Sequence, residues 1–138
     1  MFSGTTSFEI QFGDCDPAGI VYYPNYFRYF DNATAALISA ALGMNKPAWL
    51  AEHAIAGIPM VDTGAKFLRP SRFGDRVRIE SRFGDLGRSS FVVQHVLLNG
   101  EERAVEAHEK RVWAVRDEAG GIRGASLPDA VRRAFEAP

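Results

Sequence analysis

The sequence has 138 residues, of which 46% are hydrophobic and 24% are charged, and its formal net charge at pH 7 is −1. That length predicts a single domain over residues 1–138, with enough apolar side chains to build a core without disulfides or metals. The near-neutral charge argues against nucleic acid as a partner, and the single cysteine, Cys15, excludes an intramolecular disulfide.

Targeting, membrane and metal signals are not apparent in the sequence. The N-terminus has no basic segment followed by an apolar run, as a signal peptide would require. No stretch approaches the apolar length of a membrane span. The histidines, His53, His95 and His108, are scattered without a familiar zinc spacing. We therefore expect a cytoplasmic protein that holds no metal and does not enter a membrane.

The residue pattern at the start of the chain predicts a strand, a loop and a long helix. Residues 8–12 alternate apolar and polar side chains, which indicates a strand with one buried face. A loop rich in Asp, Pro and Gly follows over residues 13–19. The helix is expected to begin at Pro24, because proline suits the first helical turn, and to end at Leu42, because Gly43 is a typical stop. It is apolar on nearly all sides, so we expect it to be largely buried.

In most of the remaining chain, apolar and polar side chains alternate with a period of two, which is typical of β-strands. A short helix is expected around residues 48–53 and a terminal helix over 129–136, with a loop over 117–124. Strands are predicted near residues 59–69, 76–83, 89–98 and 103–116. Asn99-Gly100 between the last two strands is a strong hairpin signal.

This order of elements predicts an α+β fold, in which a curved antiparallel β-sheet wraps around one long central helix. A single helix covers only one face of a sheet. The other face, or an edge strand, is therefore expected to meet a partner subunit.

Asp16 is the first candidate for chemistry. It precedes Pro17, which favours an extended backbone at Asp16, and it lies shortly before a helix N-terminus with unpaired, partly positive N–H groups. A carbonyl oxygen bound there would be polarised by the N–H groups of Tyr23, Asn25 and Tyr26. The carboxylate can attack such a carbonyl directly or activate a water molecule as a general base. On residue type alone, a structural turn is the commoner role for such an Asp.

A longer unit around Asp16 carries a family resemblance. Residues 12–26, Phe-Gly-Asp-Cys-Asp-Pro-Ala-Gly-Ile-Val-Tyr-Tyr-Pro-Asn-Tyr, closely resemble the signature of the 4-hydroxybenzoyl-CoA thioesterase family of hotdog-fold proteins. The similarity extends over most of the chain and includes residues 88–91 and 110–114. It implies a hotdog fold, a homotetramer built from dimers, active sites at subunit interfaces, and an acyl-CoA substrate. No separate cofactor is implied, because CoA is part of the substrate.

The resemblance also implies roles for individual residues. Asp16 matches the catalytic carboxylate, and the backbone N–H of Tyr23 matches the donor that polarises the thioester carbonyl. Asp31 matches the position that meets the phenol hydroxyl of a hydroxybenzoyl group, although it can equally face water or another subunit. The residues that match the nucleotide-contacting segment are Arg88, Ser89 and Ser90.

Two departures refine this resemblance. The segment around Ser89 is less basic than the family pattern, so Arg69, Arg72 and Arg116 are further candidates for the CoA phosphates, which arginine binds through forked hydrogen bonds. Related short-chain acyl-CoA thioesterases carry a His near the helix start, and its absence from residues 22–24 points to the aromatic-acyl branch. A second thioesterase branch places a catalytic Glu on the central helix, and the absence of Glu between residues 24 and 43 argues against that branch.

The leading hypothesis is hydrolysis of an aromatic acyl-CoA, with 4-hydroxybenzoyl-CoA as the first substrate to test. One alternative is a thioesterase for short aliphatic acyl-CoAs. Another is a protein that binds acyl-CoA or acyl carrier protein without turnover. Among the neighbouring residues, Asp14 is expected to shape the loop and Cys15 to be a small buried residue.

Overall fold

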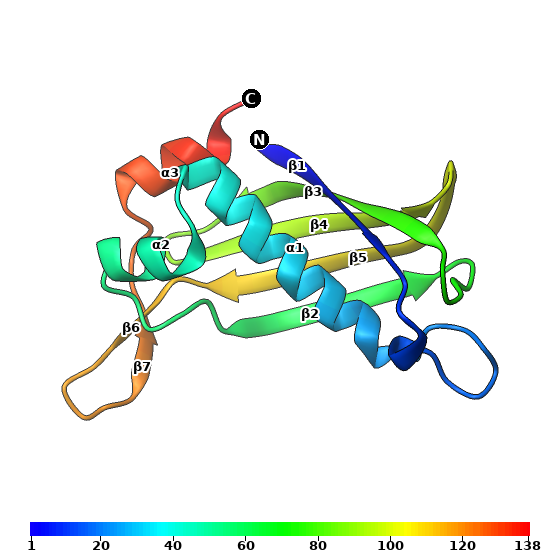
Figure 1. Ribbon diagram of the computed structural model, residues 1–138. Helices are drawn as coiled ribbons and strands as arrows, with labels where there is room; N and C mark the ends of the chain where they lie inside the picture. Colours follow the sequence, from blue (N-terminus) through cyan, green and yellow to red (C-terminus); the bar gives the residue numbers. More distant parts are fainter.

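The computed structural model describes all 138 residues, and it shows one curved sheet with one long helix lying across it (Figure 1). The elements in chain order are β1 (Ser3–Glu9), a 3-10 turn η1 (Phe12–Asp14), α1 (Pro24–Leu42), α2 (Lys46–Glu52), β2 (Met60–Phe67), β3 (Arg76–Leu86), β4 (Ser90–Asn99), β5 (Glu102–Val112), β6 (Ala114–Arg116), β7 (Ile122–Gly124) and α3 (Asp129–Glu136).

The main sheet has five strands in the order β1-β3-β4-β5-β2, and all neighbouring strands are antiparallel. Helix α1 crosses one face of this sheet, and α2 and α3 lie together at one end of it (Figure 1). The first strand before the helix and the first strand after it, β1 and β2, are the two edges. The α+β arrangement expected from the order of elements is confirmed.

Helix α1 has the bounds that its sequence predicts. It begins at Pro24 and ends at Leu42, where Gly43 takes the left-handed conformation (φ 68°) and donates its N–H to the Ser39 carbonyl. Only the side toward the sheet is buried, so the expectation of a largely buried helix is wrong for the opposite side. The buried residues of α1 are Tyr26, Tyr29, Phe30, Ala33, Thr34, Leu37 and Ile38.

Several other elements differ from the expectations. The first strand spans Ser3–Glu9 rather than residues 8–12, because the chain turns into η1 just beyond Glu9. The strand expected over residues 103–116 divides into β5 and β6, which belong to different sheets. Asn45 caps α2 by accepting the Ala48 N–H, so this helix begins at Lys46 rather than near residue 48. The loop expected over residues 117–124 ends in β7, which pairs with β6. A three-residue strand next to glycines has too little alternation to be recognised from sequence.

The core divides into two clusters along α1. One packs around Phe30, Val77 and Leu97 near the start of the helix, and the other packs around Trp113 and Phe135 beneath α2 and α3. None of the helices is both long and apolar enough to cross a membrane. The loop around Asp16 leads into the N-terminal end of α1, next to the cluster of Phe30, Val77 and Leu97.

Candidate active site

Asp16 lies at the base of a tight turn in the loop before α1. Its backbone N–H donates to the Ile20 carbonyl, and its own carbonyl accepts the Gly19 N–H, both at 2.9 Å. Gly19 has a φ of 81°, a conformation that favours glycine. The Asp16 Oδ1 atom accepts the Ala18 N–H at 2.9 Å, while Oδ2 has no hydrogen-bond donor within the chain. The half-buried carboxylate is therefore oriented through one oxygen and free at the other.

Asp14 anchors this loop to the helix, as expected. Its carboxylate accepts hydrogen bonds from Arg28 at 2.8 Å and from the Tyr29 hydroxyl at 2.7 Å. Its backbone carbonyl accepts the Tyr22 N–H at 2.8 Å and the Asn25 side-chain amide at 2.9 Å. The pKa of Tyr29 is raised above its ordinary value, mainly by burial and next by the hydrogen bond to Asp14. Both oxygens of this carboxylate are committed to holding the loop.

The helix N-terminus offers one free donor rather than three. The Asn25 N–H donates to the Tyr22 carbonyl at 2.9 Å, and the Tyr26 N–H donates to the Tyr23 carbonyl at 3.1 Å. Pro24 has no N–H. The N–H of Tyr23 has no acceptor within the chain. Asp16 and Tyr23 thus belong to one junction between loop and helix, where a carboxylate oxygen and an amide hydrogen both remain available.

A mostly apolar hollow of about 310 Å³ lies beside this junction. The Tyr23 ring is 6.3 Å from that of Phe67, and the Tyr26 ring is 5.6 Å from it, measured between centroids. Tyr23 and Phe67 are exposed in the single chain although their rings are apolar. The residues that line the hollow are Ile20, Val21, Tyr23, Tyr26, Phe67, Leu68, Arg69 and Pro70.

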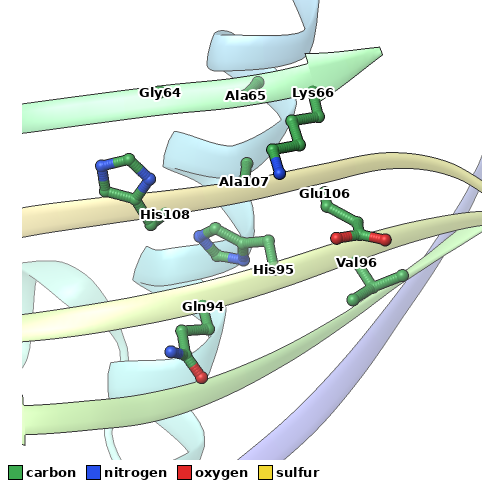
Figure 2. Close-up of a pocket in the computed structure, with 9 residues that line it drawn as sticks. All are labelled: Gly64, Ala65, Lys66, Gln94, His95, Val96, Glu106, Ala107 and His108. Atoms are coloured by element: carbon green, nitrogen blue, oxygen red, sulfur yellow. The ribbon is translucent and has the colours of Figure 1, made fainter. Parts of the chain in front are cut away.

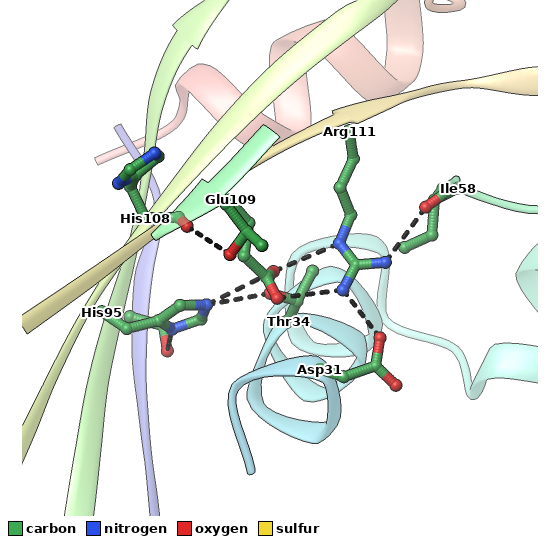
Figure 3. A network of polar contacts seen from close by, with 9 residues as sticks. Asp31, Thr34, Ile58, His95, His108, Glu109 and Arg111 are labelled. Carbon is green, nitrogen blue, oxygen red and sulfur yellow. Dashed lines mark hydrogen bonds and ion pairs between the residues drawn. The ribbon is translucent and has the colours of Figure 1, made fainter. Parts of the chain in front are cut away.

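Asp31 lies two turns along α1 and is held by an arginine from β5 (Figure 3). The Arg111 Nη2 atom donates to Asp31 Oδ1 at 2.7 Å. The Arg111 side chain is only 7% exposed, whereas that of Asp31 is 54% exposed. Arg111 also donates to both carboxylate oxygens of Glu109, at 3.2 and 3.0 Å, and to the Ile58 carbonyl at 3.0 Å. Asp31 is thus the exposed end of a polar network that continues into the core.

The inner end of this network is fully satisfied. Glu109 accepts a hydrogen bond from Thr34, and His95 Nε2 lies 3.4 Å from Glu109 Oε1 while its Nδ1 lies 2.7 Å from the Ser81 hydroxyl. Burial would raise the pKa of Glu109, but hydrogen bonds from His95, Arg111 and Thr34 hold it below its usual range. Burial alone would likewise lower the pKa of Arg111, but Glu109 and then Asp31 raise it.

The segment Arg88–Ser90 lies at the opposite end of the sheet from Asp16. The loop of Asp16 contacts the segment just before β3, where Ile20 forms a bridge with Arg72, whereas residues 88–90 follow the end of that strand (Figure 1). An eleven-residue strand spans roughly 35 Å. Arg88 is exposed and donates to the Ser126 hydroxyl at 2.9 Å. One chain therefore does not bring the two groups together.

The other candidate arginines, Arg69, Arg72 and Arg116, lie at opposite ends of the molecule. Arg69 lines the hollow beside Tyr23 and forms an ion pair of 3.1 Å with Glu102. Arg72 is next to the loop of Asp16, through the bridge with Ile20. Arg116 ends β6, at the other end of the molecule.

A second hollow, of about 500 Å³, lies on the outer face of the sheet (Figure 2). Its floor includes Gly64, where an added Cβ would lie 2.9 Å from the imidazole of His108. His108 pairs with Asp62 at 2.8 Å. The residues that line it belong to β2, β4 and β5, and neither Asp16 nor Tyr23 is among them. This hollow is separate from the junction between loop and helix.

The buried network of Glu109 and Arg111 is the feature near the candidate site that the sequence analysis did not predict. A signal was present, because both residues are in phase with the apolar positions Val105 and Trp113, and a charged pair at inward positions of a strand is unusual. Its partner Asp31 lies eighty positions away in sequence. No group of three or more His, Cys, Asp or Glu side chains is arranged so that it could hold a metal ion.

Comparisons with known proteins agree with this architecture. A model of the thioesterase-like superfamily matches residues 10–135. The chain is 37% identical over 117 residues to the 4-hydroxybenzoyl-CoA thioesterase of Pseudomonas sp. strain CBS-3, which covers 79% of this chain and 81% of the relative. It is 33% identical over 98 residues to the 1,4-dihydroxy-2-naphthoyl-CoA hydrolase of Synechococcus elongatus, which covers 71% of each chain.

The similarity extends to the three-dimensional structure. A crystal structure of a 4-hydroxybenzoyl-CoA thioesterase mutant in complex with 4-hydroxybenzoyl-CoA superimposes with a TM-score of 0.90 and 30% identity, covering 99% of this chain and 100% of the other. The sheet order, the central helix and the matched segment all agree with the family resemblance of residues 12–26. The chain therefore belongs to the thioesterase-like superfamily, as a hotdog-fold thioesterase related to the 4-hydroxybenzoyl-CoA thioesterases.

Proposed function

We propose that the protein hydrolyses an aromatic acyl-CoA, 4-hydroxybenzoyl-CoA or a close analogue, to the free acid and CoA. The observation that carries this proposal is the pairing of a half-free carboxylate, Asp16, with the one unused N–H at the start of α1, Tyr23. Two of the relatives act, by name, on aromatic acyl-CoAs. The apolar hollow beside Tyr23 supports an aromatic acyl group rather than a charged one.

In the proposed reaction, the thioester carbonyl oxygen accepts the Tyr23 N–H. The partial positive charge of the helix N-terminus favours the negative charge that develops on that oxygen. As a nucleophile, Asp16 forms a C–O bond to the carbonyl carbon, the C–S bond breaks, and CoA leaves as a thiolate that takes a proton from water. A water molecule then hydrolyses the resulting anhydride. As a general base, Asp16 instead takes a proton from water while the water oxygen forms a bond to the carbonyl carbon. The C–S bond then breaks, and the CoA thiolate takes the proton from Asp16.

CoA binding in this proposal requires two chains. Arg88, Ser89 and Ser90 of one subunit would hold the phosphates of a CoA whose thioester lies at Asp16 of another, because the two groups are at opposite ends of one chain. The edge strand β2 supports such an assembly, since it is unpaired on one side and carries exposed apolar side chains, including Met60. We propose a cytoplasmic homotetramer built from two such dimers, with no cofactor beyond the substrate.

The experiment is a panel of acyl-CoAs assayed for release of free thiol. Suitable members are 4-hydroxybenzoyl-CoA, benzoyl-CoA, 1,4-dihydroxy-2-naphthoyl-CoA and butyryl-CoA. We expect kcat/KM for the best aryl substrate to exceed that for butyryl-CoA by at least about tenfold, since an apolar pocket discriminates size and shape by roughly 10- to 200-fold. Preference for butyryl-CoA would contradict the aryl assignment. Thiol release from none of them, with retained CoA binding, would support a binding protein instead.

A further inference from the structure

The buried ion pair of Glu109 and Arg111 needs an explanation beyond stability. Both side chains lie on the inner face of β5 beneath α1, and they are 2% and 7% exposed. Buried ion pairs are weak stabilisers, because desolvation offsets most of the attraction, and apolar residues of similar volume often serve a fold as well. A buried charge that is held rigidly can instead fix the orientation of a residue that contacts its solvent-facing side.

The contact on that side is Asp31. Arg111 donates four hydrogen bonds in fixed directions, two to Glu109, one to the Ile58 carbonyl and one to Asp31 (Figure 3). The planar guanidinium cannot rotate without breaking several of them. Asp31 therefore has a defined orientation, with Oδ1 held by Arg111 and Oδ2 without a donor in the chain.

The charge of the network selects a kind of ligand. In their ionised forms, Asp31, Glu109 and the single guanidinium of Arg111 carry a net charge of −1. The free Oδ2 atom can only accept a hydrogen bond. A neutral donor such as a phenol hydroxyl is favoured at this position, and an anionic substituent is repelled.

Asp31 lies on the side of α1 that leads away from the free N–H at its start. Tyr23, Phe27 and Asp31 follow one another at intervals of four residues, so their side chains share one side of the helix. Eight residues of helix rise about 12 Å, and the Asp31 side chain leans back toward the N-terminus, which shortens this separation. An acyl group whose carbonyl is bound at Tyr23 therefore extends along this side of α1 toward Asp31.

We propose that Arg111, supported by Glu109, is a positioning residue that orients Asp31 to accept a hydrogen bond from the ring hydroxyl of the substrate. The inference rests on the proposed function and extends it to the choice among aryl groups. Arg111 touches no substrate in this account and acts only through Asp31. Its removal is therefore expected to change discrimination between hydroxylated and plain rings more than it changes hydrolysis itself.

The test compares 4-hydroxybenzoyl-CoA with benzoyl-CoA in four variants: Asp31→Asn, Arg111→Lys, Arg111→Met and the double variant Asp31→Asn/Arg111→Lys. The ratio of the two kcat/KM values is the readout. We expect each single variant to lower this ratio by roughly 10- to 100-fold, the range for a hydrogen bond to a charged group. Turnover of benzoyl-CoA should change much less. Arg111→Lys keeps the charge without the fork and, with its folding checked by thermal unfolding, serves if Arg111→Met does not fold.

The double variant decides whether Arg111 acts through Asp31. In that case, it loses no more discrimination than Asp31→Asn alone, because the two residues form one unit. An equal fall for both substrates in the Arg111 variants, or a multiplicative loss in the double variant, would overturn the inference. Arg103→Met removes an arginine from an exposed pair with Glu106 and should leave the ratio unchanged.

The proposed function can fail separately from this inference. If the wild-type protein releases thiol from neither aryl-CoA, the proposed function is wrong. Calorimetric binding of 4-hydroxybenzoate and benzoate to the wild type and to Arg111→Lys then tests the inference by itself. A preference for 4-hydroxybenzoate that disappears in Arg111→Lys supports it, and equal binding of the two acids by the wild type overturns it.

Discussion

Two carboxylates in this molecule have opposite surroundings. Glu109 is buried, and its oxygens accept hydrogen bonds from Arg111 and Thr34 beside His95. Asp16 is half-buried in a loop, has one donor from its own turn, and leaves its second oxygen free. A buried carboxylate with both oxygens bonded costs stability when it is removed and reacts poorly, whereas a carboxylate held at one oxygen can still attack or take a proton. The difference in hydrogen bonding separates a structural acid from a candidate catalyst.

The largest expected effect tests the structural side of this comparison. Glu109→Ala leaves Arg111 and His95 without their buried acceptor, and we expect the free energy of unfolding to fall by about 3–5 kcal/mol. Denaturant unfolding at one fixed protein concentration measures it, since association would otherwise change the apparent stability. Glu106→Ala removes the acid of an exposed pair on the same strand and should stay within about 0.5 kcal/mol of wild type. A similar small change for Glu109→Ala would mean that the network is not structural.

A smaller effect is expected at the N–H that faces the same junction as Asp16. Tyr23→Pro removes this donor, and the native φ of −54° suits proline. We expect kcat for an aryl-CoA to fall by about 100- to 1000-fold, which corresponds to about 2.7–4 kcal/mol of transition-state stabilisation. Tyr23→Ala is the matched control, because it removes the ring and keeps the N–H. If the two variants have the same kcat, the N–H does not polarise the carbonyl.

Local signals made much of the fold predictable. Helix α1 has the expected bounds, because Pro24 and Gly43 are start and stop signals that act within a few residues. The terminal helix over Asp129–Glu136 also has the expected bounds. The unused N–H of Tyr23 could not be found in this way. It depends on which neighbouring donors are consumed within the first turn, and only the folded backbone decides that.

The buried network was out of reach for a different reason. Asp31 and Arg111 meet only because α1 lies across β5, a packing arrangement that no local pattern specifies. The sequence could indicate that a carboxylate on an apolar helix needs a partner. It could not identify that partner. Asp16 is an intermediate case, since its residue type suggests a turn and the longer unit around it suggests catalysis.

The most direct measurement of the central claim is release of free thiol from 4-hydroxybenzoyl-CoA by Asp16→Asn, compared with wild type and with Asp14→Asn. Asp16→Asn keeps the shape of the side chain, so we expect unfolding and oligomeric state to be unchanged while kcat falls by roughly 100- to 10,000-fold. Asp14→Asn should be less stable, because its carboxylate ties the loop to Arg28 and Tyr29. Near-normal turnover by a folded Asp16→Asn variant would contradict the account.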